Sequence, residues 1–271
     1  MKNIKFLTLF ILVLTSVNTY CKVEEKKIVV VTTSFNNSEW YKKNLDSVFR
    51  QKYSNFCLIY VDDQSPDGTG NLVEQYITKN NLQEKATLIK NKNRHLALYN
   101  IYHAVHSCEN DAIIVSLDGD DWLAHPNVFS KLNEVYSDPN VWITYGQFKL
   151  SSSGEKGWCV NYPYEIVTDK QFREYGHIPS HLRTFYAGLF KKIRKIDLLH
   201  DGNFYAMSWD MAFMFPMMEM AHTHFKFIED VLYVYNDSNP ISDHMVSKEL
   251  QRKLDLEIRD KPVYDSIEKL F

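Results

Sequence analysis

Between Lys27 and about residue 125, short runs rich in β-branched residues alternate with segments whose apolar residues recur at helical spacing. The runs predicted as strands are 28–33, 56–61, 86–89 and 112–117. Strands that alternate with helices form parallel β-α-β units, whose crossovers bring the carboxyl ends of the strands to one edge of the sheet. We therefore expect an α/β fold with a mostly parallel sheet flanked by helices, and a ligand site at that edge.

The remaining elements are predicted from apolar spacing and capping residues. Asn37 or Ser38 is expected to cap a helix that ends near Arg50. After about residue 126 the alternation fades, which indicates mixed α+β structure and then a charged helical tail; the Met-rich run 211–220 is expected to be a core helix. Without repeats or low-complexity tracts, 23–271 is predicted to be one domain, with halves at about 27–125 and 126–245 and a tail at 246–271.

The first 22 residues have the layout of a secretory signal peptide. Lys2 and Lys5 precede an apolar run from Phe6 to Leu14, and small polar residues follow it. The run is well short of the ~20 residues that a membrane-spanning helix needs. We therefore leave 1–22 out of the fold, expect no transmembrane helix in the mature chain, and expect export or delivery to a secretory lumen, with tethering by this segment as the alternative.

Two acidic clusters directly follow predicted strands. Asp62 and Asp63 come after the second strand, and Asp118-Gly119-Asp120-Asp121 comes after the fourth. Because the carboxyl ends of parallel strands meet at one edge, both clusters are expected on the same rim. Three carboxylates within four positions repel one another, so either a solvated turn spreads them or a cation such as Mg²⁺ or Mn²⁺ compensates them. Gly119 would let the backbone turn so that two carboxylates face one ion.

Charge and glycine content exclude several kinds of partner and site. The formal net charge is −3, which argues against a nucleic-acid partner. The chain has 9 glycines and no Gly-rich phosphate loop, since Val73 stands where Gly68-Thr69-Gly70 would need a third glycine. Any bound phosphate must therefore be neutralised by another device. The four cysteines lack metal-ligand spacing, and buried free thiols are expected rather than a disulfide.

Four sequence blocks, taken in order, resemble the first half of a family 2 glycosyltransferase. The blocks are 29–36 (VVVTTSFN), 45–53 (LDSVFRQKY), 60–69 (YVDDQSPDGT) and 117–122 (LDGDDW). Together they cover roughly residues 27–150 and are far more specific than any single motif. The resemblance implies the GT-A fold, a Rossmann-like nucleotide-binding half followed by a mixed α+β acceptor-binding half.

The resemblance also implies a donor, a cation and the residues that hold them. In the family, the D-x-D string holds a divalent cation that bridges the diphosphate of a nucleotide-sugar, and this role falls on Asp118 and Asp120. Asp63, with Asp62, would contact the base or ribose. The other nucleotide-binding residues expected are Thr33, Asn36, Arg94 and Asp118. The donor expected is a nucleotide-diphospho-sugar, a UDP-sugar first of all, and the acceptor a hydroxyl of a glycan, protein or lipid.

The second half resembles the family less closely, and its residues are carried over one by one. The family's catalytic base is an Asp that opens a helix, which points to Asp210, with Trp209 as a sugar-stacking face and Glu219, Glu229 or Asp230 as lesser candidates for the base. Arg183, in the segment 181–185, is expected to contact acceptor or phosphate. A further metal ligand near the end of the domain points to His244, and imidazole beside carboxylates favours Mn²⁺ over Mg²⁺.

These residues predict an inverting glycosyl transfer, with two other classes of function left open. A metal-dependent phosphohydrolase could use the same acidic rim, but it would need a second metal about 3.5–4 Å from the first. A non-catalytic sugar-binding module would keep the aromatic residues and lose turnover. Intact Asp118, Asp120 and Asp210 favour the enzyme.

Overall fold

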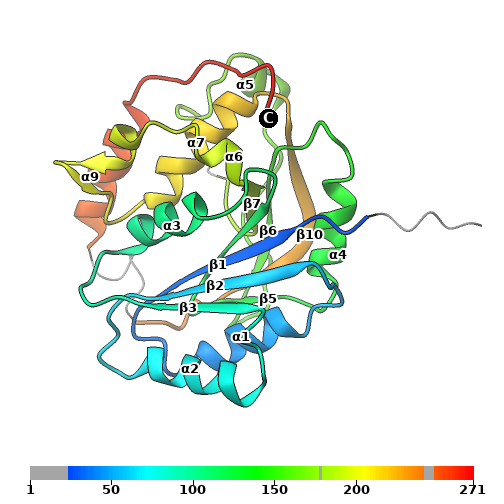
Figure 1. Cartoon of the computed structure of the whole chain (residues 1–271). Helices are drawn as coiled ribbons and strands as arrows, with labels where there is room; N and C mark the ends of the chain where they lie inside the picture. The colour runs from blue at the N-terminus through cyan, green and yellow to red at the C-terminus, as the bar shows by residue number, and fades with distance from the viewer. Residues whose placement is uncertain (1–23, 177–178, 241–246) are drawn as a thin grey trace, which may run out of the picture.

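The computed structural model of the chain describes residues 24–176, 179–240 and 247–271. One eight-stranded sheet runs through it in the order β3-β2-β1-β4-β7-β6-β10-β5 (Figure 1). The strands are β1 Ile28–Ser34, β2 Phe56–Asp62, β3 Ala86–Lys90, β4 Ile113–Asp118, β5 Trp122–Leu123, β6 Ile143–Leu150, β7 Arg183–Tyr186 and β10 Phe225–Tyr235. A separate hairpin consists of β8 Leu199–His200 and β9 Asn203–Phe204. The four strands predicted from the first half are all present.

The first four strands pair in parallel, as the alternating pattern predicts. β1 pairs with β2 on one side and with β4 on the other, and β2 pairs with β3. The run Ile28–Val31 is buried on both faces of the sheet, which explains why it is apolar without alternation.

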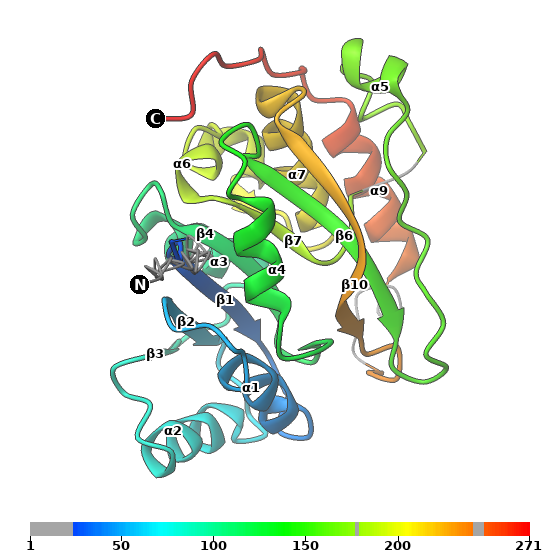
Figure 2. The ribbon, with the colours of Figure 1, turned by 90° about the vertical axis from the view of Figure 1, so that its right-hand side faces the viewer.

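The second half extends this sheet instead of building its own. β7 is inserted antiparallel between β4 and β6, β10 pairs in parallel with β6, and the short β5 pairs antiparallel with β10. Figure 2 shows the arrowheads of β1, β6 and β10 pointing toward the same edge of the molecule. Strands from both halves therefore end around one rim.

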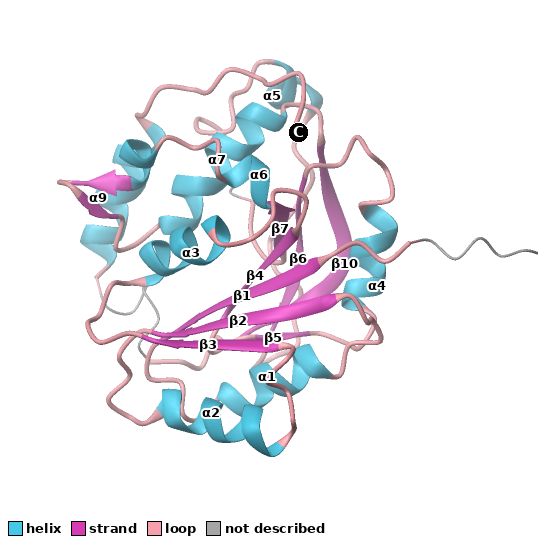
Figure 3. Cartoon of the chain, in the orientation of Figure 1, coloured by secondary structure: helices cyan, strands magenta, loops and turns pink. Residues whose placement is uncertain are grey.

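Helices cover both faces of the sheet (Figure 3). Their bounds are α1 Tyr41–Phe49, α2 Thr69–Lys79, α3 Ala97–His106, α4 Val128–Val135, α5 Tyr164–Thr168, α6 Ala187–Phe190, the 3₁₀ helix η1 Lys195–Leu198, α7 Trp209–Ala221 and α9 Lys248–Arg259. α1 and α2 lie against one face, and α3, α6 and α7 lie on the other. Within the described residues, no helix has the length and apolar character that crossing a membrane requires.

α7 is the central core helix that its Met-rich sequence predicts. Every residue from Met211 to Ala221 is buried, so the helix is apolar on all sides, as expected for one that is packed all round. The charged helix expected in the tail is present as α9, which packs against α7 and buries Leu254 and Ile258, while residues 261–271 after it are not helical. Cys57, Cys108 and Cys159 are free thiols, and only Cys159 among them is fully buried.

The predicted cap of the first helix is wrong. α1 begins at Tyr41, and neither Asn37 nor Ser38 caps it with a side chain. The Asn37 amide instead donates to Ser34 Oγ at 3.0 Å, while its backbone carbonyl accepts from the amides of Trp40 and Tyr41. The Asn37 side chain is therefore used to hold the end of β1.

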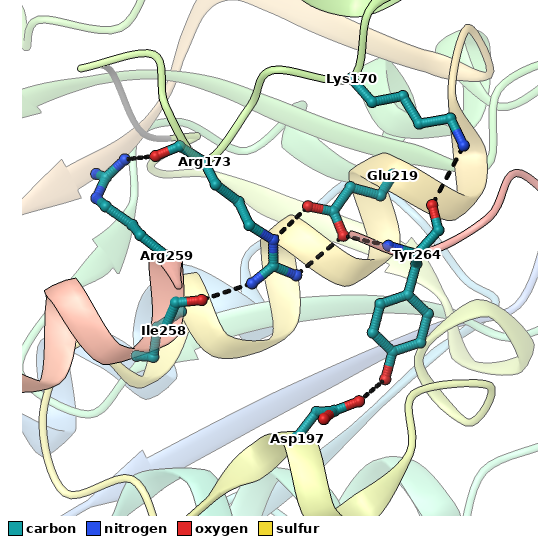
Figure 4. A network of polar contacts seen from close by, with 7 residues as sticks. All are labelled: Lys170, Arg173, Asp197, Glu219, Ile258, Arg259 and Tyr264. Atoms are coloured by element: carbon teal, nitrogen blue, oxygen red, sulfur yellow. Dashed lines mark hydrogen bonds and ion pairs between the residues drawn. The ribbon is translucent and has the colours of Figure 1, made fainter. Parts of the chain in front are cut away.

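A buried ion pair joins α7 to the C-terminal segment (Figure 4). Arg173 donates to Glu219 through Nε at 2.5 Å and Nη2 at 2.9 Å, and its Nη1 donates to the carbonyl of Ile258 at 2.6 Å. The backbone amide of Tyr264 donates to the same Glu219 carboxylate at 3.0 Å, and the Tyr264 hydroxyl donates to Asp197. The end of α7 opposite Asp210 is thus fixed to α9 and to the segment after it.

Candidate active site at the carboxyl edge of the sheet

The two acidic clusters lie on one rim because β1 separates β2 from β4. In the strand register Ser34 faces Asp62 and Thr33 faces Asp118. Backbone bonds continue the pairing into the turns, since Asp63 N donates to Ser34 O at 2.8 Å and Gly119 N donates to Thr33 O at 3.0 Å. The end of β1 is therefore flanked by carboxylates on both sides, as the sequence predicts.

The acidic turn after β4 holds its carboxylates close together and largely out of water. Asp121 is buried, and it accepts from the Tyr233 hydroxyl at 2.5 Å and from Asn236 N at 2.6 Å. Asp120 accepts from the Asn239 amide at 2.6 Å. Burial raises the pKa of Asp120, and burial together with the charges of Asp120 and Asp118 raises the pKa of Asp121 well above its usual range. The ionised carboxylates of this turn are therefore disfavoured by their surroundings, and a bound cation would compensate them.

Gly119 is required for space, a different reason from the turn flexibility that we expected. A Cβ at this position would lie 2.6 Å from Asn37 Nδ2 and 2.6 Å from Ser34 Cβ. The acidic turn thus packs directly against the end of β1, and any side chain at Gly119 would push it away.

Arg183 connects the acidic turn to the start of α7. β7 pairs with β4 so that Arg183 lies opposite Ser116, two residues before Asp118. Its guanidinium donates to Asp210 Oδ2 at 2.5 Å and lies 3.2 Å from His181 Nδ1. Burial alone would lower the pKa of Arg183, but the charges of Asp210 and Asp118 outweigh it and raise that pKa. The guanidinium is therefore a permanent positive charge between two carboxylates.

Asp118, Asp121 and His181 form the group that best fits a cation among the residues described. One ligand atom from each lies within 4.8 Å of the others. The His181 ring stacks on Tyr233 at 4.2 Å, and burial together with Arg183 lowers the pKa of His181 well below its usual range, so the imidazole is neutral, the form that ligates metals. Two carboxylates and one imidazole suit a divalent cation such as Mn²⁺.

This group overlaps only in part with the expected ligands Asp118, Asp120 and His244. Asp118 belongs to both sets, Asp120 faces Asn239, and His244 lies outside the described residues. The sequence offered no signal for His181 as a ligand, because only the pairing of β7 with β4 brings it to Asp118.

The candidate nucleotide residues line the end of β1 and β2. Asp63 accepts from the Asn91 amide at 2.8 Å and from the backbone amides of His95 and Leu96 at 2.9 and 2.7 Å. Burial works to raise the pKa of Asp63, but the Asn100 and Asn91 amides and those backbone bonds outweigh it and lower that pKa. Asp63 thus holds the loop between β3 and α3 in place.

The other candidate nucleotide residues differ in how many of their polar atoms have hydrogen-bond partners within the protein. Asp62 is buried with one carboxylate oxygen that has no hydrogen-bond partner, and the buried side-chain oxygen of Asn36 also lacks one. Thr33 is half-buried on the rim, and exposed Arg94 stacks over the Phe35 ring at 3.7 Å. Buried polar atoms without partners in the protein are what a polar ligand or a bound water would satisfy.

Asp210 lies in the first turn of α7. Its Oδ1 accepts from Met211 N at 3.0 Å while Oδ2 accepts from Arg183. Trp209 packs near Phe213, with ring centroids 6.0 Å apart, and its ring lies 5.8 Å from the Arg183 guanidinium. Asp210, Trp209 and Arg183 therefore come together, as candidates for one site should.

The lesser candidates for the general base either form a buried ion pair away from the site or lie on the surface. Glu219 is enclosed in the ion pair with Arg173 at the far end of α7. Asp230 is exposed and pairs with Lys131 at 3.2 Å, and Glu229 beside it is exposed as well. The arrangement leaves Asp210 as the carboxylate of α7 that reaches the acidic turn through Arg183.

Comparisons with known proteins agree on the fold. TarS 1–349 of S. aureus in complex with UDP-GlcNAc superposes with a TM-score of 0.59 at 17% identity, over 86% of this chain and 64% of that one. The mannosyltransferase PcManGT from Pyrobaculum calidifontis, in complex with GDP-Man and Mn²⁺, superposes with a TM-score of 0.58 at 17% identity, over 89% and 66%. These likenesses establish a GT-A glycosyltransferase fold.

The sequence comparisons place the chain in a family. The model of Glycosyl transferase family 2 matches residues 29–197, more than half of the chain. A Bacillus subtilis (strain 168) protein named as a glycosyltransferase, EpsE, is 30% identical over 105 residues, which are 39% of this chain and 36% of EpsE. The chain thus spans about a third of EpsE and under two thirds of the two structures above. The protein belongs to glycosyl transferase family 2.

Proposed function

We propose that the protein transfers a sugar from a nucleotide-diphospho-sugar, a UDP-sugar first of all, to a hydroxyl of a glycan, protein or lipid, with inversion at the anomeric carbon. The observation that carries this proposal is the contact between Arg183 and Asp210, which joins a candidate base to the rim that bears Asp118. A donor bound along β1 would then have its sugar between the acidic turn and α7.

A divalent cation, Mn²⁺ in preference to Mg²⁺, would be held by Asp118 with Asp121 and His181, and Asp120 is the further ligand that the family resemblance implies. When bound, it would act as a Lewis acid that offsets charge on the departing diphosphate. The raised pKa values of Asp120 and Asp121 support a cation here, because burial disfavours the ionised form of both carboxyls and Asp121 also lies beside the charges of Asp120 and Asp118.

Asp210 is the proposed general base. The acceptor hydroxyl attacks the anomeric carbon, the bond from that carbon to the diphosphate oxygen breaks, and the hydroxyl proton passes to Asp210. A single displacement inverts the configuration and releases the nucleoside diphosphate. Trp209 and Arg183 would contact the acceptor, while Arg183 also orients the Asp210 carboxylate.

The nucleotide would occupy the rim formed by β1 and β2. Asp62 and Asn36 offer oxygen atoms without partners, and Thr33 and Arg94 lie on the accessible side of the same rim. Asp63 supports the loop that carries Arg94, so it would act on the nucleotide directly or by holding that loop.

A thermal-shift screen and a donor-hydrolysis assay test the proposal together. UDP, GDP and CDP are added with and without Mn²⁺ to the wild-type protein and to the Asp118→Asn and Asp210→Asn variants. We expect metal-dependent stabilisation by one nucleoside diphosphate, lost in Asp118→Asn and kept in Asp210→Asn. Transfer should fall by roughly 10²–10⁴ in Asp210→Asn. Wild-type transfer by both variants would contradict the roles assigned.

We also propose that the segment before residue 23 directs the protein out of the cytosol, on the strength of Lys2, Lys5 and the apolar run 6–14. Protease accessibility in fractionated cells tests it. Protection that disappears only when the enclosing membrane is opened is the expected result, and digestion in the cytosolic fraction would contradict it.

A further inference from the structure

Residues 151–162, which we call the β6 loop, are held tightly against β6. Backbone bonds run from Leu150 N to Glu155 O at 2.9 Å and from Gly157 N to Phe148 O at 2.8 Å. Two side chains of β6 bind loop carbonyls, Gln147 to Cys159 at 3.0 Å and Tyr145 to Val160 at 2.9 Å. Main-chain groups on both sides of residue 158 are therefore fixed by the sheet.

Trp158 is the aromatic residue of this well-anchored loop whose side chain remains exposed. The residue is 56% exposed, although the next residue, Cys159, is buried. The indole packs edge-on against Phe148, with centroids 4.9 Å apart. At Gly157 a Cβ would lie 2.3 Å from the Phe148 ring, so the loop backbone touches that ring and could not do so with another residue. The protein thus holds a tryptophan at a defined position and leaves much of it in water.

Two sets of contacts connect the β6 loop to the candidate active site, and the first of them involves Trp158 itself. The first runs through rings, since Phe148 contacts both Trp158 and His181, the latter with centroids 5.8 Å apart. The second runs through polar groups, where Ser151 Oγ and Ser152 N each donate to Asp237 at 3.0 Å.

The segment of Asp237 is the same one that supports the acidic turn. Asn236 N donates to Asp121 and the Asn239 amide donates to Asp120, both at 2.6 Å. The β6 loop and the acidic turn are therefore fixed to a common segment, so the place of Trp158 relative to the site is determined by the fold.

We propose that Trp158 is a stacking platform for a saccharide ring of the acceptor. This inference rests on the proposed glycosyl transfer and names the class of acceptor that the site takes. A pyranose ring has an apolar C–H face and a hydroxylated edge, and an indole offers a flat apolar face with an N–H at its rim. The other exposed residues of the β6 loop are mostly polar, among them Ser152, Glu155 and Lys156, and Val160 is the apolar residue exposed beside them. A single flat ring bordered by polar groups suits a sugar better than an extended apolar chain.

The experiment compares Trp158→Ala and Trp158→Phe with a matched control, Tyr164→Ala. Tyr164 is 76% exposed and lies on α5, which Figure 2 shows at the end of the molecule opposite the carboxyl end of β6. The probes are methyl β-D-glucopyranoside, methyl β-D-galactopyranoside, methyl α-D-mannopyranoside and N-acetylglucosamine, each added with UDP and Mn²⁺ for binding and with the donor for transfer.

We expect a saccharide-dependent change in tryptophan fluorescence in the wild-type protein and in Tyr164→Ala that is clearly smaller in Trp158→Phe, where Trp209 is the remaining tryptophan proposed to contact the acceptor. Trp158→Ala should raise the KM for the saccharide about tenfold, with kcat and acceptor-free donor hydrolysis within about twofold of wild type. Trp158→Phe should recover most of the KM, because it keeps an aromatic face.

Three results would overturn the inference. The first is an unchanged KM in Trp158→Ala, and the second is a loss of donor hydrolysis in that variant as large as its loss of transfer to the saccharide. The third is a wild-type protein that binds UDP but responds to none of the four probes. Failure of the wild-type protein to bind any nucleoside diphosphate would overturn the proposed function itself, and the two failures are thus told apart.

Discussion

The Arg183 guanidinium donates a 2.5 Å hydrogen bond to Asp210 across 27 positions of sequence. Arg183 is 4% exposed and comes from a strand, while Asp210 opens a helix. A buried arginine next to a carboxylate fixes the direction in which that carboxylate points, because the planar guanidinium donates along set directions. The contact therefore fixes the orientation of the proposed base relative to the sheet.

Replacing Arg183 by Ala should cost about 3–5 kcal/mol in the free energy of unfolding, because it leaves Asp210 and Asp118 without their buried counter-charge. Arg183→Lys should cost less but should still impair transfer, since an ammonium cannot reproduce the forked geometry. Urea unfolding measures both. The control is Arg194→Ala, which removes an ion pair whose arginine side chain is 60% exposed and should change the free energy of unfolding little. Equal effects at the two positions would contradict the prediction.

Gly119→Ala should destabilise the protein by about 1–3 kcal/mol, because its Cβ would collide with Ser34 and Asn37. Displacement of the acidic turn should also weaken Mn²⁺-dependent binding of nucleotide. Gly176→Ala is the matched control, with nothing within 4 Å of its Cβ, and should change stability by less than about 0.5 kcal/mol. Calorimetry of nucleotide binding and urea unfolding measure the two effects, and tight nucleotide binding by Gly119→Ala would argue against a role for this packing.

Asp63 should make folding stability fall at acid pH. Its folded pKa is below the value of about 3.8 for an unperturbed Asp, so the unfolded chain binds the proton more readily. The stabilisation is complete above that value and is lost as pH falls through the folded pKa. Asp63→Asn should be less stable at pH 7 by about 1–3 kcal/mol and should show a shallower fall between about pH 5 and pH 2. Urea unfolding across that range measures it, with exposed Asp111→Asn as control; parallel curves for wild type and Asp63→Asn would refute it.

The Arg173–Glu219 pair should be a structural element without a catalytic role. Arg173→Met and Glu219→Met should each cost about 3–5 kcal/mol, because each leaves a buried charge without its partner, and the double variant should cost much less than their sum. Nucleotide binding should be unaffected by any of them. Lys131→Met, at an exposed pair, serves as control and should cost about 0–1 kcal/mol. An additive double variant would show that the two charges do not depend on each other.

The first half of the fold could be predicted because its signals are local. The apolar runs that become β1 and β4 are buried on both faces, so their sequence marks them as strands without knowledge of their neighbours. β3 is marked by its short apolar run although only Ala86 in it is buried. The expectation that both acidic clusters share a rim follows from the same rule and is confirmed. The prediction that Asn37 caps the first helix is wrong because its side chain donates a hydrogen bond to Ser34 instead. Gly119 of the acidic turn packs against both of these side chains.

The strand order and the site residues of the second half could not be predicted in this way, because they depend on contacts between residues far apart in the sequence. β7 has only four residues, too few for periodicity, and its place between β4 and β6 is decided by pairing across some 70 positions. His181 reaches Asp118 only through that pairing, so sequence spacing could not single it out as a ligand. The role proposed for Trp158 could not be predicted from the sequence either, since it depends on the exposure of its side chain and on the close packing of Gly157 against Phe148.

Because β7 is inserted beside β4, one side of β4 stays unpaired until late in the synthesis of the chain. While the ribosome has released only the first half, β4 has β1 on one side and an open row of backbone amides and carbonyls on the other. That row is covered only when residues 183–186 emerge and pair with it. The half before residue 125 is thus not a separable module. A gene cut near that residue would yield a sheet with an unpaired strand edge, prone to self-association in the cell that made it.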